Sequence, residues 1–450
     1  MKRNEFLRTS STFVAGSVLL PTLSCRPDPG KPPVPDTPGI TRTNWAANYV
    51  YKAPNLHRPG SVAELQELVA RLGSQKALGS RHCFNDIADS PLNQISTENL
   101  NRVVSIDRST QQVTVESGMR YGDLAPQLER EGLALHNLAS LPHISIAGAC
   151  ATATHGSGVG NGNLASPLLA FDLITPDGQV VTLTRQDPEF YGAAVHLGAL
   201  GVVSRLTLQA QDTYQVAQRV FLDLPLEEAV GHFDAIMSAG YSVSLFTDWM
   251  DQKVSQVWVK SRPGTDREIT TADFYGARAA DRDVHPIISL GAENCTPQMG
   301  LPGPWFERLP HFKMGFMPSS GEELQAEFFV PRENAPDVLQ AIERQKDRIF
   351  PHLHISEIRS VAADDFWLSP ASGRDVVAFH FTWKRHPEEV PALIRLIERE
   401  LDPFGLVPHW GKLFSLDPAL LHKRYPRMND FIALARKFDP AGKLKMPTST

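Results

Sequence analysis

The sequence predicts a two-domain α+β protein, and three observations support this prediction. The 450-residue chain has an ordinary globular composition, with 42% hydrophobic and 21% charged residues. Helical and strand periodicities alternate through its first half. In its second half, alternating strands are joined by two helices, which is typical of an antiparallel sheet covered by helices on one face. The net charge of −6 leaves no basic surplus for a phosphate backbone, so no nucleic-acid partner is expected.

Residues 1–25 are predicted to be an export signal. A basic start precedes an apolar run at 12–20 that is too short to span a bilayer. The start resembles a twin-arginine signal, with Asn4 in place of the second arginine. A serine before Cys25 loosely fits a lipoprotein cleavage site, and the alternative is a discarded or exposed cysteine. We therefore expect an exported protein that is periplasmic or anchored to the membrane through a lipid on Cys25.

A proline-rich linker is predicted over residues 26–43, and the first domain over 44–212. In that domain, Ser61 and Glu64 form a capping box that starts a helix, and Gly73 ends it. Turn signals and alternation predict the remaining elements, which are a helix over 122–131 and strands at 76–78, 103–106, 113–115, 171–175, 180–183 and 202–208.

The second domain is predicted over residues 213–420, and residues 421–450 are expected to return to the first domain. Helices are predicted over 335–349 and 390–401. Alternation predicts strands at 242–247, 256–260, 324–330, 353–361, 376–383 and 409–414.

The segment 138–164 is unusually rich in glycine, serine and threonine. Glycine lets backbone N–H groups approach one anion, and the hydroxyls add donors, so a phosphate-bearing cofactor is one natural occupant. A flexible surface loop is the alternative that composition alone leaves open.

Polar residues lie at regular positions in the second-domain strands. Glu357 and Arg359 share a face with Leu353, Ile355 and Val361, because residues two apart in a strand point the same way. His380 and Thr382 lie opposite an apolar face of their strand, and Lys412 lies within the last predicted strand. A buried charge is costly unless it is paired, so these residues indicate either a structural ion pair or a ligand cavity for a polyhydroxylated substrate.

Seven motifs in a fixed order resemble flavoproteins of the vanillyl-alcohol oxidase family, and most closely its bacterial alditol (xylitol) oxidases. The resemblance covers roughly residues 43–443. The motifs are GSRHCFN at 79–85, NLASLPHIS at 137–145, ATHGSG at 153–158, YSVSLFTDW at 241–249, EIR at 357–359, HFTW at 380–383 and PHWGK at 408–412.

This resemblance implies a two-lobed, PCMH-type FAD-binding domain, a substrate domain that covers the flavin ring, and FAD attached covalently through His82. By similarity, the substrate is held by Ser140, Glu357, Arg359, Thr382 and Lys412, and the catalytic residues are Arg359, Lys412, Glu357 and His380. The implied cofactor residues are His82, Gly79, Ser80, Arg81, Cys83, Ser140, Ser145, Gly148, Thr152, Thr154, His155, Gly156, Gly158 and Val202.

The implied reaction is oxidation of a terminal hydroxyl of an alditol such as xylitol or sorbitol to the aldose. Hydride would pass to flavin N5, and O2 would then reoxidise the flavin to give hydrogen peroxide. Arg359 and Lys412 would stabilise the developing alkoxide. The group that takes the proton is open between His380 and a solvent molecule. We expect a monomer.

Three alternatives accompany these expectations. An aldonolactone oxidase or dehydrogenase would share the flavin motifs and the Glu-x-Arg pair. A periplasmic metal- or carbohydrate-binding lipoprotein is suggested by His352 and His354. Cys83 could form a second covalent bond to the flavin, but we prefer the interpretation that it is a packed, unreacted thiol. Near the C-terminus, Met446 stands where relatives carry an asparagine, which would alter the surroundings of the flavin.

Overall fold

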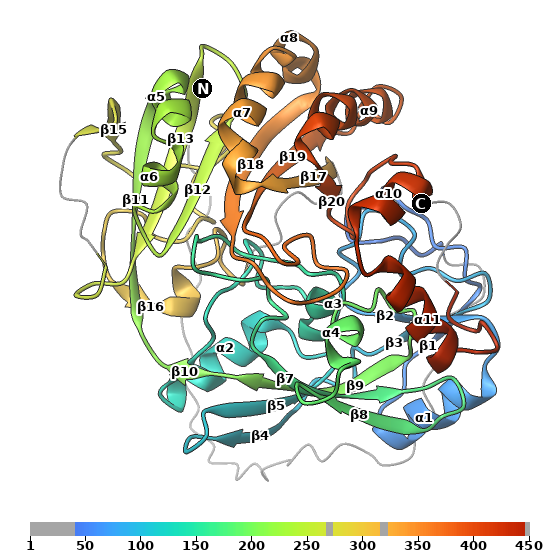
Figure 1. Ribbon diagram of the computed structural model, residues 1–450. Helices are drawn as coiled ribbons and strands as arrows, with labels where there is room; N and C mark the ends of the chain where they lie inside the picture. Colours follow the sequence, from blue (N-terminus) through green and yellow to red (C-terminus); the bar gives the residue numbers. More distant parts are fainter. Residues whose placement is uncertain (1–40, 267–272, 316–322, 446–450) are drawn as a thin grey trace, which may run out of the picture. The chain divides into compact units, whose positions relative to one another are not determined.

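The computed structural model describes residues 41–266, 273–315 and 323–445 (Figure 1). The predicted signal, the lipid site at Cys25, most of the linker and Met446 lie outside these residues and stay predictions. Chain contacts group residues 35–450 into one compact unit. Within it, we call residues 41–212 the first lobe and the described part of 213–420 the second lobe.

The first lobe contains a small parallel sheet and a larger antiparallel sheet. The parallel sheet has the order β1-β3-β2, and helix α1 connects β1 to β2. At the start of α1, Ser61 Oγ accepts from Glu64 N at 3.2 Å, as the capping box predicts. The antiparallel sheet has the order β4-β5-β9-β7-β8. The bounds are β1 Asn55–His57, α1 Val62–Arg71, β2 Gln75–Leu78, β3 Asn93–Ser96, β4 Val103–Asp107, β5 Gln112–Glu116, α2 Tyr121–Arg130, α3 Ile146–Ala151, β7 Leu168–Ile174, β8 Val180–Thr184, α4 Phe190–Ala193 and β9 Val202–Gln209.

The second lobe is built on a ten-stranded sheet whose neighbouring strands pair in antiparallel fashion. Its order is β14-β15-β11-β13-β12-β18-β19-β17-β20, with β16 paired to β11. A separate short pair, β6 with β10, precedes it. The bounds are β6 Leu133–Ala134, β10 Gln211–Asp212, β11 Gln215–Pro225, β12 Ser242–Thr247, β13 Lys253–Ser261, β14 Asp273–Phe274, β15 Ala277–Ala279, β16 Gly303–Pro304, β17 Glu323–Pro331, β18 Leu353–Val361, β19 Val376–Lys384 and β20 Val407–Pro408.

Helices cover one face of this sheet (Figure 1). Helices α5, α7 and α9 pack in that order, and α9 also contacts β17. The other face carries the polar side chains described below, so the expected α+β fold with a helix-covered antiparallel sheet is confirmed. The bounds are α5 Leu226–Gly231, α6 Phe233–Met237, α7 Ala335–Glu343, α8 Lys346–Ile349 and α9 Val390–Leu401, with short 3-10 turns at Trp305–Glu307, Arg332–Asn334, Phe350–His352 and Asp402–Phe404.

Two predicted elements differ from the structure. The helix expected over 335–349 is interrupted after Glu343, where Gln345 N bonds to Ile342 O in a turn. The strand expected over 409–414 is wrong. After β20 the chain turns, and Lys412 N donates to His409 O at 3.0 Å. The alternation of polar and apolar residues over 409–414 therefore reflects a turn, and not the pleat of a β-strand. Strand β11, which lies beside β13, was not predicted.

One large cluster of buried residues extends from Ile87 in the first lobe to Leu434 near the C-terminus. The C-terminal helices are α10, Pro418–Arg424, and α11, Met428–Phe438, and α11 packs against α4. Beyond them, Lys443 Nζ donates to Ala70 O and Pro176 O, each at 2.8 Å. No helix among the described residues combines the length and the apolar character needed to cross a membrane.

Candidate active site

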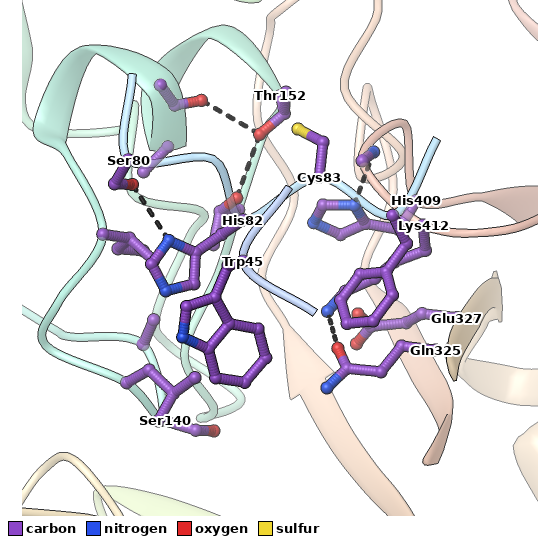
Figure 2. Close-up of a pocket in the computed structure, with 18 of the residues that line it drawn as sticks. Trp45, Ser80, His82, Cys83, Ser140, Thr152, Gln325, Glu327, His409 and Lys412 are labelled. Carbon is purple, nitrogen blue, oxygen red and sulfur yellow. Dashed lines mark hydrogen bonds between the residues drawn. The ribbon is translucent and has the colours of Figure 1, made fainter. Parts of the chain in front are cut away.

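A cavity of about 540 Å³ lies between the two lobes, within the usual range for small-molecule and cofactor sites. The loop after β2, the segment 139–155 and the loop 196–198 line it from the first lobe. Strands β17, β18 and β19 and the turn at 409–412 line it from the second lobe (Figure 2). The predicted site residues that the structure brings together here are Gly79, Ser80, Arg81, His82, Cys83, Ser140, Ser145, Gly148, Thr152, Thr154, His155, Glu357, Arg359, His380, Thr382 and Lys412.

Three predicted cofactor residues do not line the cavity. Gly156 allows a close backbone approach, because a Cβ there would lie 2.4 Å from Leu138 O. Gly158 has φ +139°, and its N–H donates to Ser360 O at 2.9 Å, which ties the glycine-rich segment to β18. Val202 is fully buried in a separate apolar cluster behind the wall, and its neighbour Val203 lines the cavity instead. In the structure, these positions support the wall.

His82 is held at the cavity by its two neighbours in space. Its Nδ1 lies 3.1 Å from Ser80 Oγ, and its ring stacks on Trp45 with centroids 5.1 Å apart. Burial, together with the charge of Lys412, lowers the pKa of His82 to about 3, so the imidazole is neutral near pH 7. Its Nε2 is buried and has no hydrogen-bond partner among the described residues. The histidine therefore offers one free ring nitrogen to a ligand.

Two glycines bring the first-lobe segments close together beside this histidine. A Cβ at Gly79 would lie 2.5 Å from Ser145 Oγ, and one at Gly148 would lie 2.8 Å from the same atom. Ser145 N in turn donates to Ser80 Oγ at 3.0 Å. A Cβ at either glycine would therefore displace the Ser145 hydroxyl, which packs beside both positions.

The opposite wall holds a network of buried charges. From β18, Arg359 donates through Nη2 to Glu327 Oε1 at 2.7 Å and through Nη1 to Ser140 Oγ at 3.3 Å. Arg359 Nε lies 3.5 Å from Glu357 Oε1. Glu327, from β17, is also 3.1 Å from His155 Nε2 and 3.3 Å from His380 Nδ1. Thus Arg359 and Glu327 each contact a first-lobe residue, whereas Glu357 contacts Arg359 and His311 of the second lobe.

The charges of this network determine its protonation. Burial alone would raise the pKa of Glu327 and of Glu357. At both carboxyl groups the charge of Arg359 outweighs this effect of burial. His155 adds to it at Glu327, and His311 adds to it at Glu357. The pKa of each carboxyl group therefore lies well below its usual range. Burial lowers the pKa of His380 despite the opposing charge of Glu327. At neutral pH the site therefore holds two carboxylates, one guanidinium and a neutral His380.

Lys412 reaches the cavity from the turn after β20 rather than from a strand. Its ammonium contacts Gln325 Oε1 and lies 4.8 Å from the ring centroid of Phe84 (Figure 2). Burial lowers its pKa, and Glu327 and Glu323 oppose that effect. A second cation thus faces the same space as Arg359.

Several cavity residues escaped the sequence analysis. Glu323, Gln325 and Glu327 alternate with apolar residues along β17, and all three line the cavity. The period-two rule that singled out Glu357 and Arg359 would have found them. His311, which also lines the cavity, had no such signal because it lies in a loop. Lys260, behind the wall, had none because it is one of two lysines in β13 and nothing in the strand sets it apart.

The described cysteines are expected to stay unmodified when the native protein is treated with iodoacetamide at about pH 8, because only the thiolate reacts. Burial raises the pKa of Cys83 to about 11 and those of Cys150 and Cys295 to about 12, so all three remain protonated thiols. Peptide mass mapping measures the alkylation, and the unfolded protein is the positive control. Rapid native labelling of Cys83 would contradict this prediction and the preference for a packed thiol.

Of the two histidines that suggested a metal site, His354 lines the cavity and His352 lies outside it. Among the described residues, His352 groups with His386 and Glu389 rather than with His354. The Nδ1 atoms of the two histidines are 2.7 Å apart, which a hydrogen bond between imidazoles explains without an ion. None of these three residues lines the cavity.

Comparison with known families matches both lobes. A model described as an FAD binding domain matches residues 54–184. A model described as D-arabinono-1,4-lactone oxidase matches residues 317–447. Together they cover the two walls of the cavity, except for the segment between them.

Curated relatives match nearly the whole chain. Alditol oxidase of a Streptomyces species is 47% identical, over 89% of this chain and 96% of the relative. L-gulono-1,4-lactone dehydrogenase of Mycobacterium tuberculosis is 31% identical, over 88% and 95%. L-gulonolactone oxidase of Mus musculus is 27% identical, over 90% and 96%.

Two solved structures share the fold. A solvent-stable cholesterol oxidase aligns with a TM-score of 0.71 at 16% identity, over 90% of this chain and 96% of its own. Cholesterol oxidase from B. sterolicum aligns with a TM-score of 0.72 at 14% identity, over 90% and 95%. At these identities the likeness concerns the fold alone.

Proposed function

Because the chain belongs to the family of FAD-dependent oxidoreductases that includes alditol oxidase and the L-gulonolactone enzymes, we propose that its substrate is an alditol. The reaction is oxidation of a terminal primary hydroxyl to the aldose, with O2 as electron acceptor and hydrogen peroxide as product. The observation that carries this proposal is the second-lobe wall, where two basic side chains, three carboxyl groups and the Thr382 hydroxyl face one cavity.

The cavity residues fit FAD. His82 offers a buried ring nitrogen without a partner, and Gly79 and Gly148 let the backbone pack closely around Ser145 in the same wall. Thr152 and Thr154 line the same wall and add hydroxyl groups. Bound FAD would supply the acceptor for two electrons from the alditol and would pass them to O2. We further propose that His82 attaches it covalently, because a neutral imidazole with Nδ1 directed to Ser80 carries a free lone pair on Nε2.

A polyhydroxylated chain matches the wall because each of its hydroxyls both donates and accepts. Glu357 accepts hydrogen bonds, and Arg359 and Lys412 donate them. Ser140 and Thr382, whose hydroxyls line the cavity, can do either. Arg359 and Lys412 also place positive charge where the hydroxyl oxygen becomes an alkoxide. Orientation by several such contacts contributes several kcal/mol of the rate enhancement.

We assign the proton acceptor to His380. Its Nδ1 is 3.3 Å from Glu327 Oε2, and its Nε2 is 3.2 Å from Thr382 Oγ1 on the cavity side. Its lowered pKa leaves a neutral ring, which is the form that can accept a proton. Glu327 then stabilises the imidazolium, as a carboxylate does beside a histidine base.

The purified protein is expected to be yellow and to lose its flavin colour when xylitol or sorbitol is added anaerobically. Air should restore the colour with formation of hydrogen peroxide. Stopped-flow reduction with xylitol, sorbitol, L-gulono-1,4-lactone and cholesterol measures the preference. We expect fast reduction by the alditols, because open-chain hydroxyls can engage both Glu357 and Lys412.

Faster reduction by the lactone than by either alditol would replace the proposed substrate class with aldonolactones. Fast reduction by an alditol without peroxide on aeration would retain the substrate and exclude O2 as acceptor. A colourless protein that takes up no flavin would contradict the whole assignment.

A further inference from the structure

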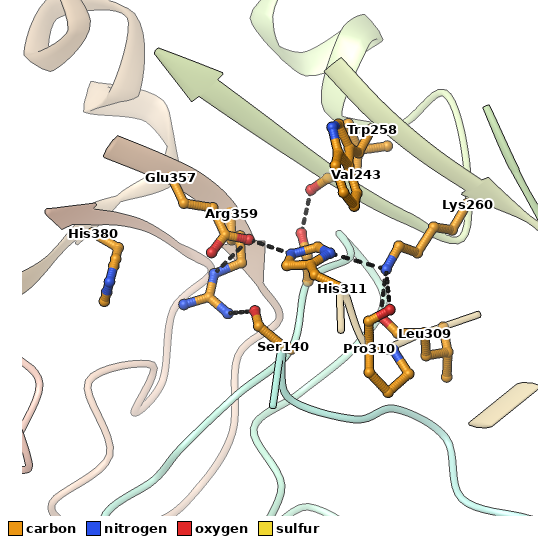
Figure 3. Close-up of polar contacts among 12 residues, drawn as sticks. Ser140, Val243, Trp258, Lys260, Leu309, Pro310, His311, Glu357, Arg359 and His380 are labelled. Atoms are coloured by element: carbon orange, nitrogen blue, oxygen red, sulfur yellow. Dashed lines mark hydrogen bonds and ion pairs between the residues drawn. The ribbon is translucent and has the colours of Figure 1, made fainter. Parts of the chain in front are cut away.

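A buried chain of polar contacts runs from Glu357 away from the cavity and ends at β13 (Figure 3). Glu357 Oε1 is 2.7 Å from His311 Nε2, and His311 Nδ1 is 3.2 Å from Lys260 Nζ. All three side chains are buried, with exposed fractions of 7% for Glu357, 4% for His311 and 1% for Lys260. The chain links a cavity carboxylate to a lysine that lies behind the wall.

Among the described residues, Lys260 forms no salt bridge with a carboxylate, although its side chain is almost fully buried. Its ammonium instead donates to Leu309 O, to Pro310 O and to His311 Nδ1. A lysine ammonium has three donors, so these three acceptors satisfy it completely. Burying a charge costs free energy unless such bonds compensate for it, so Lys260 stays buried through these three acceptors, one of which is the His311 ring.

These contacts fix the tautomer of His311. Burial, together with the charge of Lys260, lowers the pKa of His311 to about 4, so the ring is neutral at neutral pH. Because Lys260 donates to Nδ1, the single ring hydrogen must be on Nε2, where it is donated to Glu357 Oε1. The ring is also held edge-on against Phe246 and Trp258, at centroid distances of 5.4 and 5.1 Å.

We propose that Lys260 and His311 are positioning residues that fix the Glu357 carboxylate as the hydroxyl acceptor of the substrate site. Oε1 is engaged by His311 and lies 3.5 Å from Arg359 Nε, which leaves Oε2 for a substrate hydroxyl. The backbone of His311 also donates to Ser140 O at 3.2 Å, so the same loop supports two substrate-binding residues. The identity of the substrate in this inference rests on the proposed function. The arrangement of the Glu357 carboxylate does not, because it follows from the contacts of that side chain.

The first experiment compares steady-state constants for xylitol at about pH 6, where Lys260 keeps its proton, since burial lowers its pKa to about 7. We expect His311→Leu and Lys260→Met each to raise KM about tenfold or more, with a smaller change in kcat, because an interaction with the bound substrate is lost. His311→Gln should restore KM to within about threefold, since its amide can accept from Lys260 and donate to Glu357.

Lys253→Met is the matched control, because Lys253 lies on the same strand and pairs with Asp223 outside the cavity. Its KM should equal that of the wild type. Flavin content and thermal unfolding are measured for every variant. If His311→Leu and Lys260→Met lower only the unfolding temperature and leave KM unchanged, the two residues are structural and the proposal is wrong.

A second experiment needs no substrate. Proton and nitrogen correlation spectra of protein labelled with [15N]histidine report which ring nitrogen carries hydrogen, and the His311→Gln spectrum identifies the signal of His311. We expect the Nε2–H tautomer in the wild type and a shifted tautomer equilibrium in Lys260→Met. An Nδ1–H tautomer in the wild type would overturn the proposal even if alditols are oxidised. The expected tautomer in a protein that oxidises no alditol would contradict only the proposed function.

Discussion

Replacing Arg359 with methionine is expected to slow flavin reduction by an alditol at least about 100-fold, the effect of removing one donor to a developing oxyanion. Arg359 contacts Ser140, Glu327 and Glu357 at the cavity wall, so the variant loses both substrate charge stabilisation and the support of two carboxylates. Stopped-flow absorbance at saturating xylitol measures the rate, and the flavin spectrum checks that the cofactor is retained.

The same variant is expected to lower the free energy of unfolding by about 3–5 kcal/mol, because it leaves buried carboxylates without their cation. The double variant Arg359→Met, Glu327→Gln removes one of these charges and is the control. We expect it to recover part of the stability and none of the rate. If the double variant regains the rate of flavin reduction, Arg359 acts only by holding the fold together, and its assigned role is wrong.

Replacing His82 with alanine is expected to abolish covalent flavin attachment. In the wild type, the flavin should stay with the polypeptide after acid precipitation. In the variant, all of it should pass into the supernatant, because the buried Nε2 is lost. Flavin fluorescence of the two fractions, and of the band in a denaturing gel, measures the attachment.

Cys83→Ala is the control for this experiment, because Cys83 is adjacent in sequence and lines the same cavity. We expect it to keep the covalent flavin. Loss of attachment in Cys83→Ala with retention in His82→Ala would reverse the assignment. Release of flavin from the wild type by acid would show that the cofactor is bound without a covalent link.

The sequence predicted those site residues whose signal is local. Alternation along one strand identified Glu357 with Arg359, and alternation along the next identified His380 with Thr382, because a strand directs every second side chain to the same face. The same reasoning would have reached Glu327 if it had been applied to β17. These residues could be predicted from the sequence, because secondary structure alone determines which of them share a face of the sheet.

The remaining features depend on contacts between distant segments. Lys260 and His311 are 51 positions apart, and no periodicity connects a strand lysine to a loop histidine. The position of Lys412 in a turn was missed because a turn at Gly411 and a pleated strand produce the same short alternation of polar and apolar residues. Gly156 and Gly158 satisfied a composition rule for anion binding, which could not reveal their close contacts with Leu138 and Ser360 in the folded chain.

The hydrogen bond from Gly158 N to Ser360 O bears on how such enzymes can be recombined. Ser360 directly follows Arg359, so the backbone of the glycine-rich segment is joined to the strand that carries the central cation of the site. The two lobes are therefore not interchangeable modules. A chimera assembled from two relatives would need glycine at position 158 to keep that register, because φ there is +139° and a Cβ would lie 2.4 Å from Tyr241 O.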